Sequence, residues 1–137
     1  RQAEQDAEKA RQRAAADRVL LDTFSSTEDM VLARDGKIGG IESQIKLTEN
    51  QIEQLEANLQ AIVAAAAEQE KQGRTPGEKV EQDIANVRQQ IERKQAFIAG
   101  KRAEQDEVRA QFDADISRFE ELKNAQAESA ARRATQN

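Results

Sequence analysis

The chain has 137 residues, a net charge of −5, and 26 acidic and 21 basic side chains. Ala, Glu, Lys, Leu and Arg together make up half of it, a bias typical of long helices and coiled coils. Leu, Ile, Val and Phe number only 26, which borders on the composition of disordered chains. Cys, His, Trp and Tyr are absent, and this excludes disulfides, thiolate or imidazole metal sites and Ser–His or Cys–His nucleophiles.

Residues 1–24 are predicted to form a helical extension. They are rich in Ala, Gln and charged residues, so helix propensity is high but little can be buried before the apolar cluster at residues 19–24. The chain begins with Arg1 and not with Met, so we expect a processed form or a fragment.

A helix boundary or kink is predicted near residue 26. Both Ser25 with Glu28 and Ser26 with Asp29 have capping-box spacing, and the second pair is the weaker because Asp is the shorter acid.

Two heptad series follow and predict two coiled-coil arms, at residues 25–72 and 78–123. The large apolar residues fall at positions a and d, alternately three and four apart. In the first series these are Phe24, Val31, Ile38, Ile41, Ile45, Ile52, Leu55, Leu59 and Ile62, and in the second Val80, Ile84, Val87, Ile91, Ile98, Val108, Phe112, Phe119 and Leu122. Residues 73–77 hold the single Pro and two of the six Gly, which indicates a turn. Residues 124–137 are predicted to be a fraying tail.

The two arms are expected to form an antiparallel hairpin, so the predicted fold class is all-α: a long antiparallel coiled-coil helical hairpin with an N-terminal helical extension. Centring the turn between Pro76 and Gly77 makes the numbers of facing residues add up to 153. This register pairs Leu55 with Ile98, Ile62 with Ile91, Ala66 with Val87, Ile45 with Val108, Ile41 with Phe112, Val31 with Leu122 and Thr48 with Gln105. On the flanks it brings together Glu49 and Arg102, Glu42 and Arg109, and Glu28 and Lys123.

Polar residues interrupt the seam at Arg34, Thr48, Lys94, Lys101, Gln105 and Asp115. We interpret them as fixing the alignment of the helices and not as a ligand site. Arg34 and Asp115 lie in adjacent layers and are candidates for pairing with each other.

Apolar residues off the seam are the best indication of a partner, either a second copy or another protein. Leu32 and Leu47 lie far round the helix, whereas Phe97 and Ile116 widen the apolar stripe. Leu20, Leu21 and Phe24 lie at the open end of the hairpin. The candidate partner-binding residues are therefore Leu20, Leu21, Phe24, Leu32, Leu47, Phe97 and Ile116.

The sequence offers no candidate catalytic, cofactor or metal site. Paired carboxylates such as Glu120 and Glu121 have no predicted pocket, and Asp113 and Asp115 lack the further ligands of a calcium loop. The acidic balance and mixed charges argue against a nucleic-acid partner. No apolar run is long enough to span a membrane, and no small-molecule substrate is foreseen.

The stretch from Asp17 to Ile38, followed by residues 45–49 (Ile-Lys-Leu-Thr-Glu), resembles a group of uncharacterised gammaproteobacterial envelope proteins. These have a signal peptide, sometimes a small β-rich module, which is missing here, and then a coiled-coil segment like residues 17–123. The resemblance implies residence in the periplasm and no particular activity. A cytoplasmic location is the alternative.

The expected role is that of a non-enzymatic coiled-coil spacer or docking scaffold in the bacterial envelope. The alternative is a chaperone-like or adaptor protein that binds client polypeptides at the open end of the hairpin, near Leu20, Leu21 and Phe24.

Overall fold

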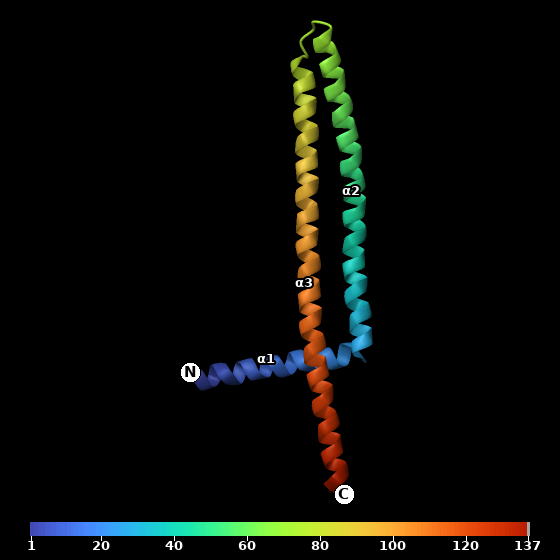
Figure 1. Cartoon of the computed structure of the whole chain (residues 1–137). Helices are drawn as coiled ribbons and strands as arrows, with labels where there is room; N and C mark the ends of the chain where they lie inside the picture. The colour runs from blue at the N-terminus through green and yellow to red at the C-terminus, as the bar shows by residue number, and fades with distance from the viewer. Residues whose placement is uncertain (137) are drawn as a thin grey trace. The chain divides into compact units, whose positions relative to one another are not determined.

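The computed structural model describes residues 1–136, which form three helices (Figure 1). They are α1 (Gln2–Thr23), α2 (Thr27–Lys71) and α3 (Glu78–Gln136). The described residues contain no strand, so the predicted all-α class is confirmed, and α2 and α3 pack as an antiparallel hairpin. Both helices run through two compact units, which are described separately: unit 1 (residues 1–38 and 107–136) and unit 2 (residues 39–106).

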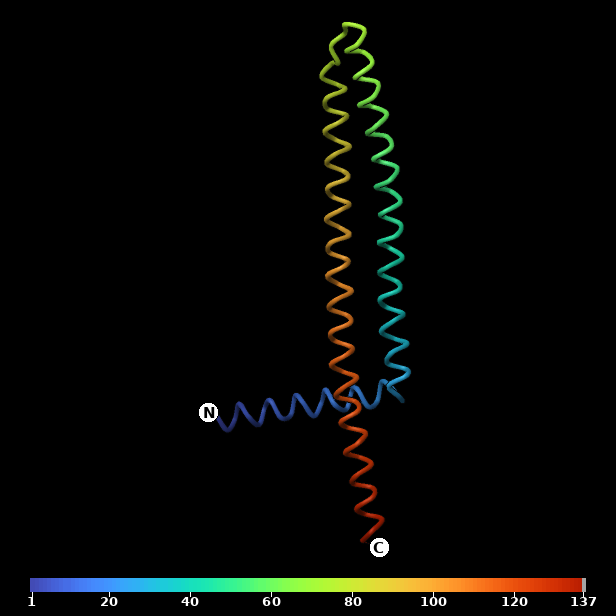
Figure 2. Tube along the Cα trace, viewed as in Figure 1, coloured from blue at the N-terminus to red at the C-terminus, as the bar shows by residue number. Residues whose placement is uncertain are grey.

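The heptad pattern accounts for burial in each unit. Every predicted a and d position from Phe24 to Leu122 is buried or half-buried, polar ones included. In unit 2 the buried centre consists of Ile52, Val87 and Ile91, against which Leu55, Leu59, Ile62 and Ile98 pack. A narrow seam therefore holds this unit together, and its two helical segments run side by side in opposite directions (Figure 2).

The link between α2 and α3 is set by two glycines. The amide of Gly73 donates to the carbonyl of Glu70 at 3.0 Å, and the amide of Arg74 donates to the carbonyl of Gln69 at 2.9 Å. This is the Schellman arrangement, and Gly73 has the positive φ of 80° that it requires. The α3 helix then starts at Gly77, whose carbonyl accepts from Val80 and Glu81 but which has no side chain to cap the first turn.

The residues that border a depression near the turn agree with the predicted register. Near the turn, a shallow depression is lined by Val63 with Arg88, Ala67 with Ile84, and Glu70 with Glu81, along with Ala66. The numbers of Glu70 and Glu81 add up to 151, as do those of the predicted flank pair Glu49 and Arg102. The link between the helices is short, since α2 ends at Lys71 and α3 begins at Glu78.

The predicted flank pair of Arg102 and Glu49 is present in unit 2, and Arg102 also binds Glu42. Arg102 lies 3.6 Å from Glu49, as predicted, and 2.8 Å from Glu42. The side-chain amide of buried Gln105 also donates to Glu42, at 2.9 Å. This hydrogen bond, more than the charge of Arg102, lowers the pKa of Glu42. The other buried polar residue of the seam, Thr48, donates its hydroxyl to the carbonyl of Gln44.

Unit 1 contains the break between α1 and α2. Helix α1 ends at Thr23, Phe24 is extended, and α2 begins at Thr27. Ser26 is the residue that caps α2, because its hydroxyl accepts the amide of Asp29 at 3.1 Å. The cap at α2 therefore comes from the Ser26–Asp29 pair, which was predicted to be the weaker capping box. The Asp29 carboxylate also accepts the hydroxyl of Ser25 at 2.6 Å.

Two predicted pairs of unit 1 are wrong. Arg34 binds Asp113 at 2.9 Å, and not Asp115, whose carboxylate accepts the amide of Gln111. Asp113 lies two residues earlier on the same helix, within reach of the extended guanidinium. Lys123 lies over the ring of Phe119 at 5.5 Å instead of pairing with Glu28.

The predicted tail is helical as far as Gln136, with every side chain from residue 123 onward exposed. No Gly or Pro interrupts this stretch, and its Ala, Gln, Glu and Arg residues favour the helix. Residue 137, the end of the predicted tail, lies outside the described residues.

Candidate interaction surfaces

The seven predicted partner-binding residues are divided between the two units. Leu20, Leu21, Phe24 and Ile116 are half-buried in unit 1. Leu32 of unit 1 is 71% exposed, and in unit 2 Leu47 is 61% and Phe97 45% exposed. The first group therefore contributes mainly to internal packing, whereas the second group is accessible.

Helix α1 is attached to α3 through its last two turns. The guanidinium of Arg118 donates to both carboxylate oxygens of Asp17, at 2.9 and 2.7 Å. Arg118 also donates to Glu121 on its own helix at 2.8 Å. The paired hydrogen bonds lower the pKa of Asp17 and raise the pKa of Arg118, so both groups stay charged through the neutral range.

Apolar side chains complete this attachment. The rings of Phe24 and Phe112 meet edge to face, with centroids 6.4 Å apart. Met30 and Phe119 are almost fully buried in unit 1, at 0% and 2% exposure. By contrast, every side chain of residues 1–16 is exposed, and Figure 2 shows this part of α1 leading away from α3.

Leu21 lies at an open groove of about 460 Å³ beside α3. The groove is lined by Leu21, Leu122, Ala125, Gln126, Ser129 and Arg133. Three of these residues are apolar and three are polar, with Arg133 as the single cation of the lining. Of the predicted open-end residues, Leu21 is the one that faces such a groove.

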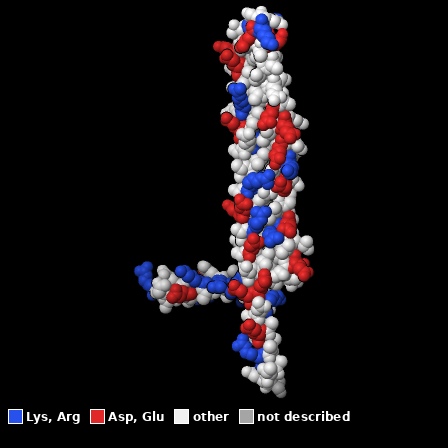
Figure 3. Space-filling model, in the orientation of Figure 1, with Lys and Arg blue, Asp and Glu red and all other residues white. Residues whose placement is uncertain are grey.

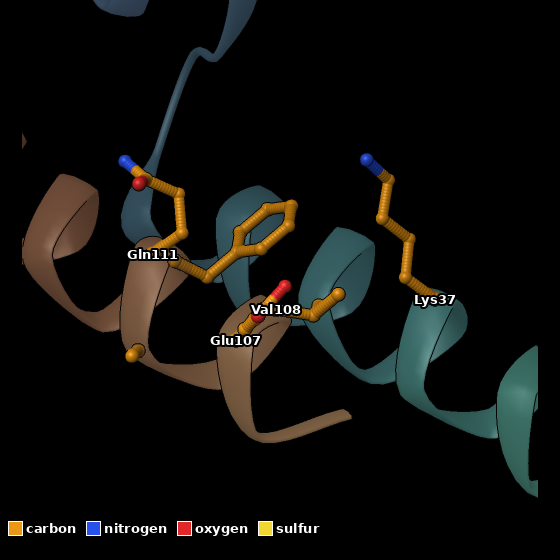
Figure 4. Close-up of a pocket in the computed structure, with 6 residues that line it drawn as sticks. Lys37, Glu107, Val108 and Gln111 are labelled. Carbon is orange, nitrogen blue, oxygen red and sulfur yellow. The ribbon is translucent and has the colours of Figure 1, made fainter. Parts of the chain in front are cut away.

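A second open depression of unit 1, of about 590 Å³, lies beside Phe112 (Figure 4). Lys37 reaches it from α2, while Glu107, Val108 and Gln111 reach it from α3. The Lys37 ammonium lies 5.5 Å from the centre of the Phe112 ring. One acid and one cation that lie beside an open apolar wall lack the enclosed geometry of a catalytic pocket.

The two flanks of the hairpin in unit 2 differ in charge. One flank carries the ionic group of Glu42, Glu49 and Arg102, with Lys46 at 4.0 Å from both acids. On the other flank the Lys94 ammonium donates an inter-helix hydrogen bond to Gln51 at 2.9 Å. Leu47 lies one turn before Gln51 and Phe97 one turn after Lys94, so both exposed apolar residues belong to this second flank.

Charge elsewhere on the surface is mixed. Figure 3 shows acidic and basic side chains interspersed along the visible face, without a large field of one sign.

Two features were missed by sequence reasoning. Met30 falls outside the a and d positions of the heptads, yet it is fully buried. The Asp17–Arg118 pair joins residues 101 positions apart. No heptad relation connects them, although the preceding apolar cluster could have suggested that α1 packs on something.

In the described residues no group of three or more acidic side chains could hold a metal ion, and no helix is long and apolar enough to cross a membrane. Comparisons with protein-family models, with curated proteins and with solved structures find nothing that matches this chain.

Proposed function

We propose that this chain is a non-enzymatic docking scaffold, a helical hairpin that binds protein partners through apolar side chains on its flanks. The observation that carries the proposal is the exposure of Leu32, Leu47 and Phe97 in a chain with few large apolar residues. Exposing these side chains costs little in a monomer but offers anchors to a partner.

Three properties support a scaffold over an enzyme. The open depressions lack an enclosed catalytic geometry, the polar residues of the seam bond within the hairpin, and the fold is a narrow helical pair. Such a fold supplies long exposed faces rather than a cavity that excludes water.

In-cell photocrosslinking tests the proposal. A photoreactive amino acid replaces Leu32 or Leu47 in the full chain, and Glu92, an exposed polar position of α3, serves as the matched control. We expect discrete crosslinked bands from the two apolar positions and none from Glu92. Equal, diffuse labelling at all three positions would contradict a docking role.

A chaperone-like role is the second candidate, and the groove beside Leu21 favours it. An open groove with apolar side chains in its lining suits an extended apolar client segment. Leu21→Asp should abolish suppression of client aggregation, whereas Val19→Asp, at a 63% exposed position outside the groove lining, should not. If Leu21→Asp leaves suppression unchanged, the groove is not a client site.

We further propose that the chain resides in the bacterial envelope, on the strength of the sequence resemblance at residues 17–49. Fractionation of the native bacterium should recover the protein with periplasmic markers. Recovery with cytoplasmic markers alone would contradict this location.

A further inference from the structure

We propose that the break between α1 and α2 is a conformational switch within unit 1. The bent arrangement described above is the resting state. In the second, straight state, α1 and α2 join into one helix, the end of α1 packs along the exposed tail of α3, and Asp17 exchanges Arg118 for Arg133. The proposal goes beyond the docking function and does not depend on it.

The break contains no residue that forbids a helix. Residues 24–26 are Phe-Ser-Ser, without Gly or Pro, and Phe24 has an ordinary extended backbone with φ −119° and ψ 141°. Serine hydroxyls compete for the hydrogen bonds of a helix but do not exclude it. The local sequence therefore permits both a break and a continuous helix, and side-chain contacts decide between them.

The heptad phase of the seam runs through the break without a shift. Counted back from Val31 at position a, Phe24 is again a, Leu20 is d and Asp17 is a. A straight helix would therefore carry Leu20 and Phe24 on the same apolar stripe as the first arm. A permanent bend would not require the two helices to share this phase.

The tail of α3 carries an uncovered continuation of the same seam. Its a and d positions after Phe119 are Leu122, Gln126, Ser129 and Arg133. All four line the open groove of about 460 Å³ described above, together with Ala125 and with Leu21 of α1. The groove is thus the place where the next part of a straight first arm would lie, and Leu21 already borders it.

The register places Asp17 beside a second cation in the straight state. The numbers of contacting residues on the two arms add up to 147 for Arg34 with Asp113 and to 151 for Glu49 with Arg102. On a straight helix the same relation puts Asp17 level with residues 130–134. Arg133 lies in this range, on the seam face, and its exposed guanidinium donates to the carbonyl of Ser129 on its own helix at 3.4 Å.

The two states exclude each other, because Phe24 cannot keep its contact in both. In the bent state its ring lies 6.4 Å from that of Phe112. On a straight helix Phe24 would be level with residues 123–127, about 16–22 Å farther along α3. The change is therefore between two discrete arrangements, and the straight one fills the groove beside Leu21, so the switch would control access to that groove.

Spin-label distances in the full chain test the proposal, since the chain has no native Cys. Labels are placed at Ala7→Cys and Ala110→Cys, two exposed positions of unit 1. In the bent state these sites lie about 15 Å from Asp17 and about 12 Å from Arg118 along their helices, so they are within about 35 Å of each other. In the straight state at least about 45 Å of helix separates them.

Double electron–electron resonance should show mainly the shorter distance in the wild type. Arg118→Gln should raise the population at the longer distance about threefold or more, because Asp17 then has its cation in the straight state alone. Arg93→Gln, at an exposed position of α3 in unit 2, is the matched control and should leave the distribution unchanged. Wild-type helicity by circular dichroism shows that the variants fold.

Two further changes in the Arg118→Gln background identify the longer distance. Thr27→Pro should abolish it, because Pro suits the first position of α2 and keeps the residue before it out of the helix. Arg133→Gln should lower it. A broad distribution without a distinct longer distance would show that α1 detaches without straightening. That result, or a longer distance that persists with Thr27→Pro or is unaffected by Arg133→Gln, would overturn the proposal.

Discussion

Single polar side chains determine where the helices of unit 1 begin and how they meet. Ser26 supplies one hydroxyl to the first turn of α2, and Asp17 supplies both carboxylate oxygens to Arg118. Neither residue belongs to the apolar seam. Their effects are therefore separable from core packing and can be measured one at a time.

Removal of the cap should destabilise unit 1. Ser26→Ala leaves the amide of Asp29 without its acceptor, and loss of such a cap costs about 1 kcal/mol. Urea unfolding followed by circular dichroism measures the loss. Ser117→Ala, at an exposed helical position, should change stability by less than about 0.5 kcal/mol, and an equal effect of both variants would refute the capping role.

The attachment of α1 should depend on pH at the acid end. The pKa of Asp17 is lowered in the folded state by its hydrogen bonds to Arg118. The stabilisation is therefore complete above the ordinary aspartate pKa of about 3.9 and is lost as the pH falls through the lowered value. Fluorescence energy transfer between labels on α1 and α3 should be constant from about pH 7 to pH 5 and fall below about pH 4.

Asp17→Asn provides the control for that titration, because an amide has no proton to gain in this range. We expect weaker energy transfer at neutral pH and a flat profile down to the onset of general unfolding. A wild-type profile retained in Asp17→Asn would assign the transition to another carboxyl.

At the scale of helices, the periodicity of apolar residues predicts most of the fold. The side chains at positions a and d are all buried or half-buried. Two helices that pack on each other cover only a narrow stripe of each surface, and the heptad pattern marks that stripe. Individual polar pairs were less predictable, since a long side chain such as Arg34 can reach Asp113 as well as Asp115. The Asp17–Arg118 contact could not be predicted, because it follows from the direction that the chain takes after Phe24.

Two glycines should respond oppositely to the same substitution. Gly36 lies within α2 with open space around it, so Gly36→Ala should stabilise the protein by up to about 1 kcal/mol. Gly73 has a φ of 80°, so Gly73→Ala should destabilise the hairpin by about 1 kcal/mol or more. Thermal unfolding of the two variants and the wild type measures both changes in stability. Melting temperatures that shift in the same direction for the two variants would contradict the end of α2 at Gly73.

For the whole chain, stability rests on two units that share α2 and α3 and on no central globular core. The buried side chains follow the seam along each unit, whereas every side chain of residues 1–16 and 123–136 is exposed. Hydrogen exchange should accordingly be slow around Ile52 and Ile91 and fast in both of the exposed segments. Uniform protection along the chain would contradict this division.

The hairpin within a single chain can be trapped directly. Ile62→Cys with Ile91→Cys places one thiol on each helix in the buried cluster of unit 2, and oxidation should give a monomeric crosslinked product. Closing a loop of this length should add about 3–4 kcal/mol to the free energy of unfolding. Non-reducing gels and thermal unfolding measure the two effects, and a product that is only dimeric would show that the helices pair between chains.

The link at Gly73–Gly77 gives the hairpin a weak end. Gly77 begins α3 without a hydroxyl or carboxylate to hold the first amides, and Glu70 and Glu81 border the same depression nearby. On heating, the hairpin should therefore unfold first at the turn. Separation of α2 from α3 should then spread from the turn along the seam.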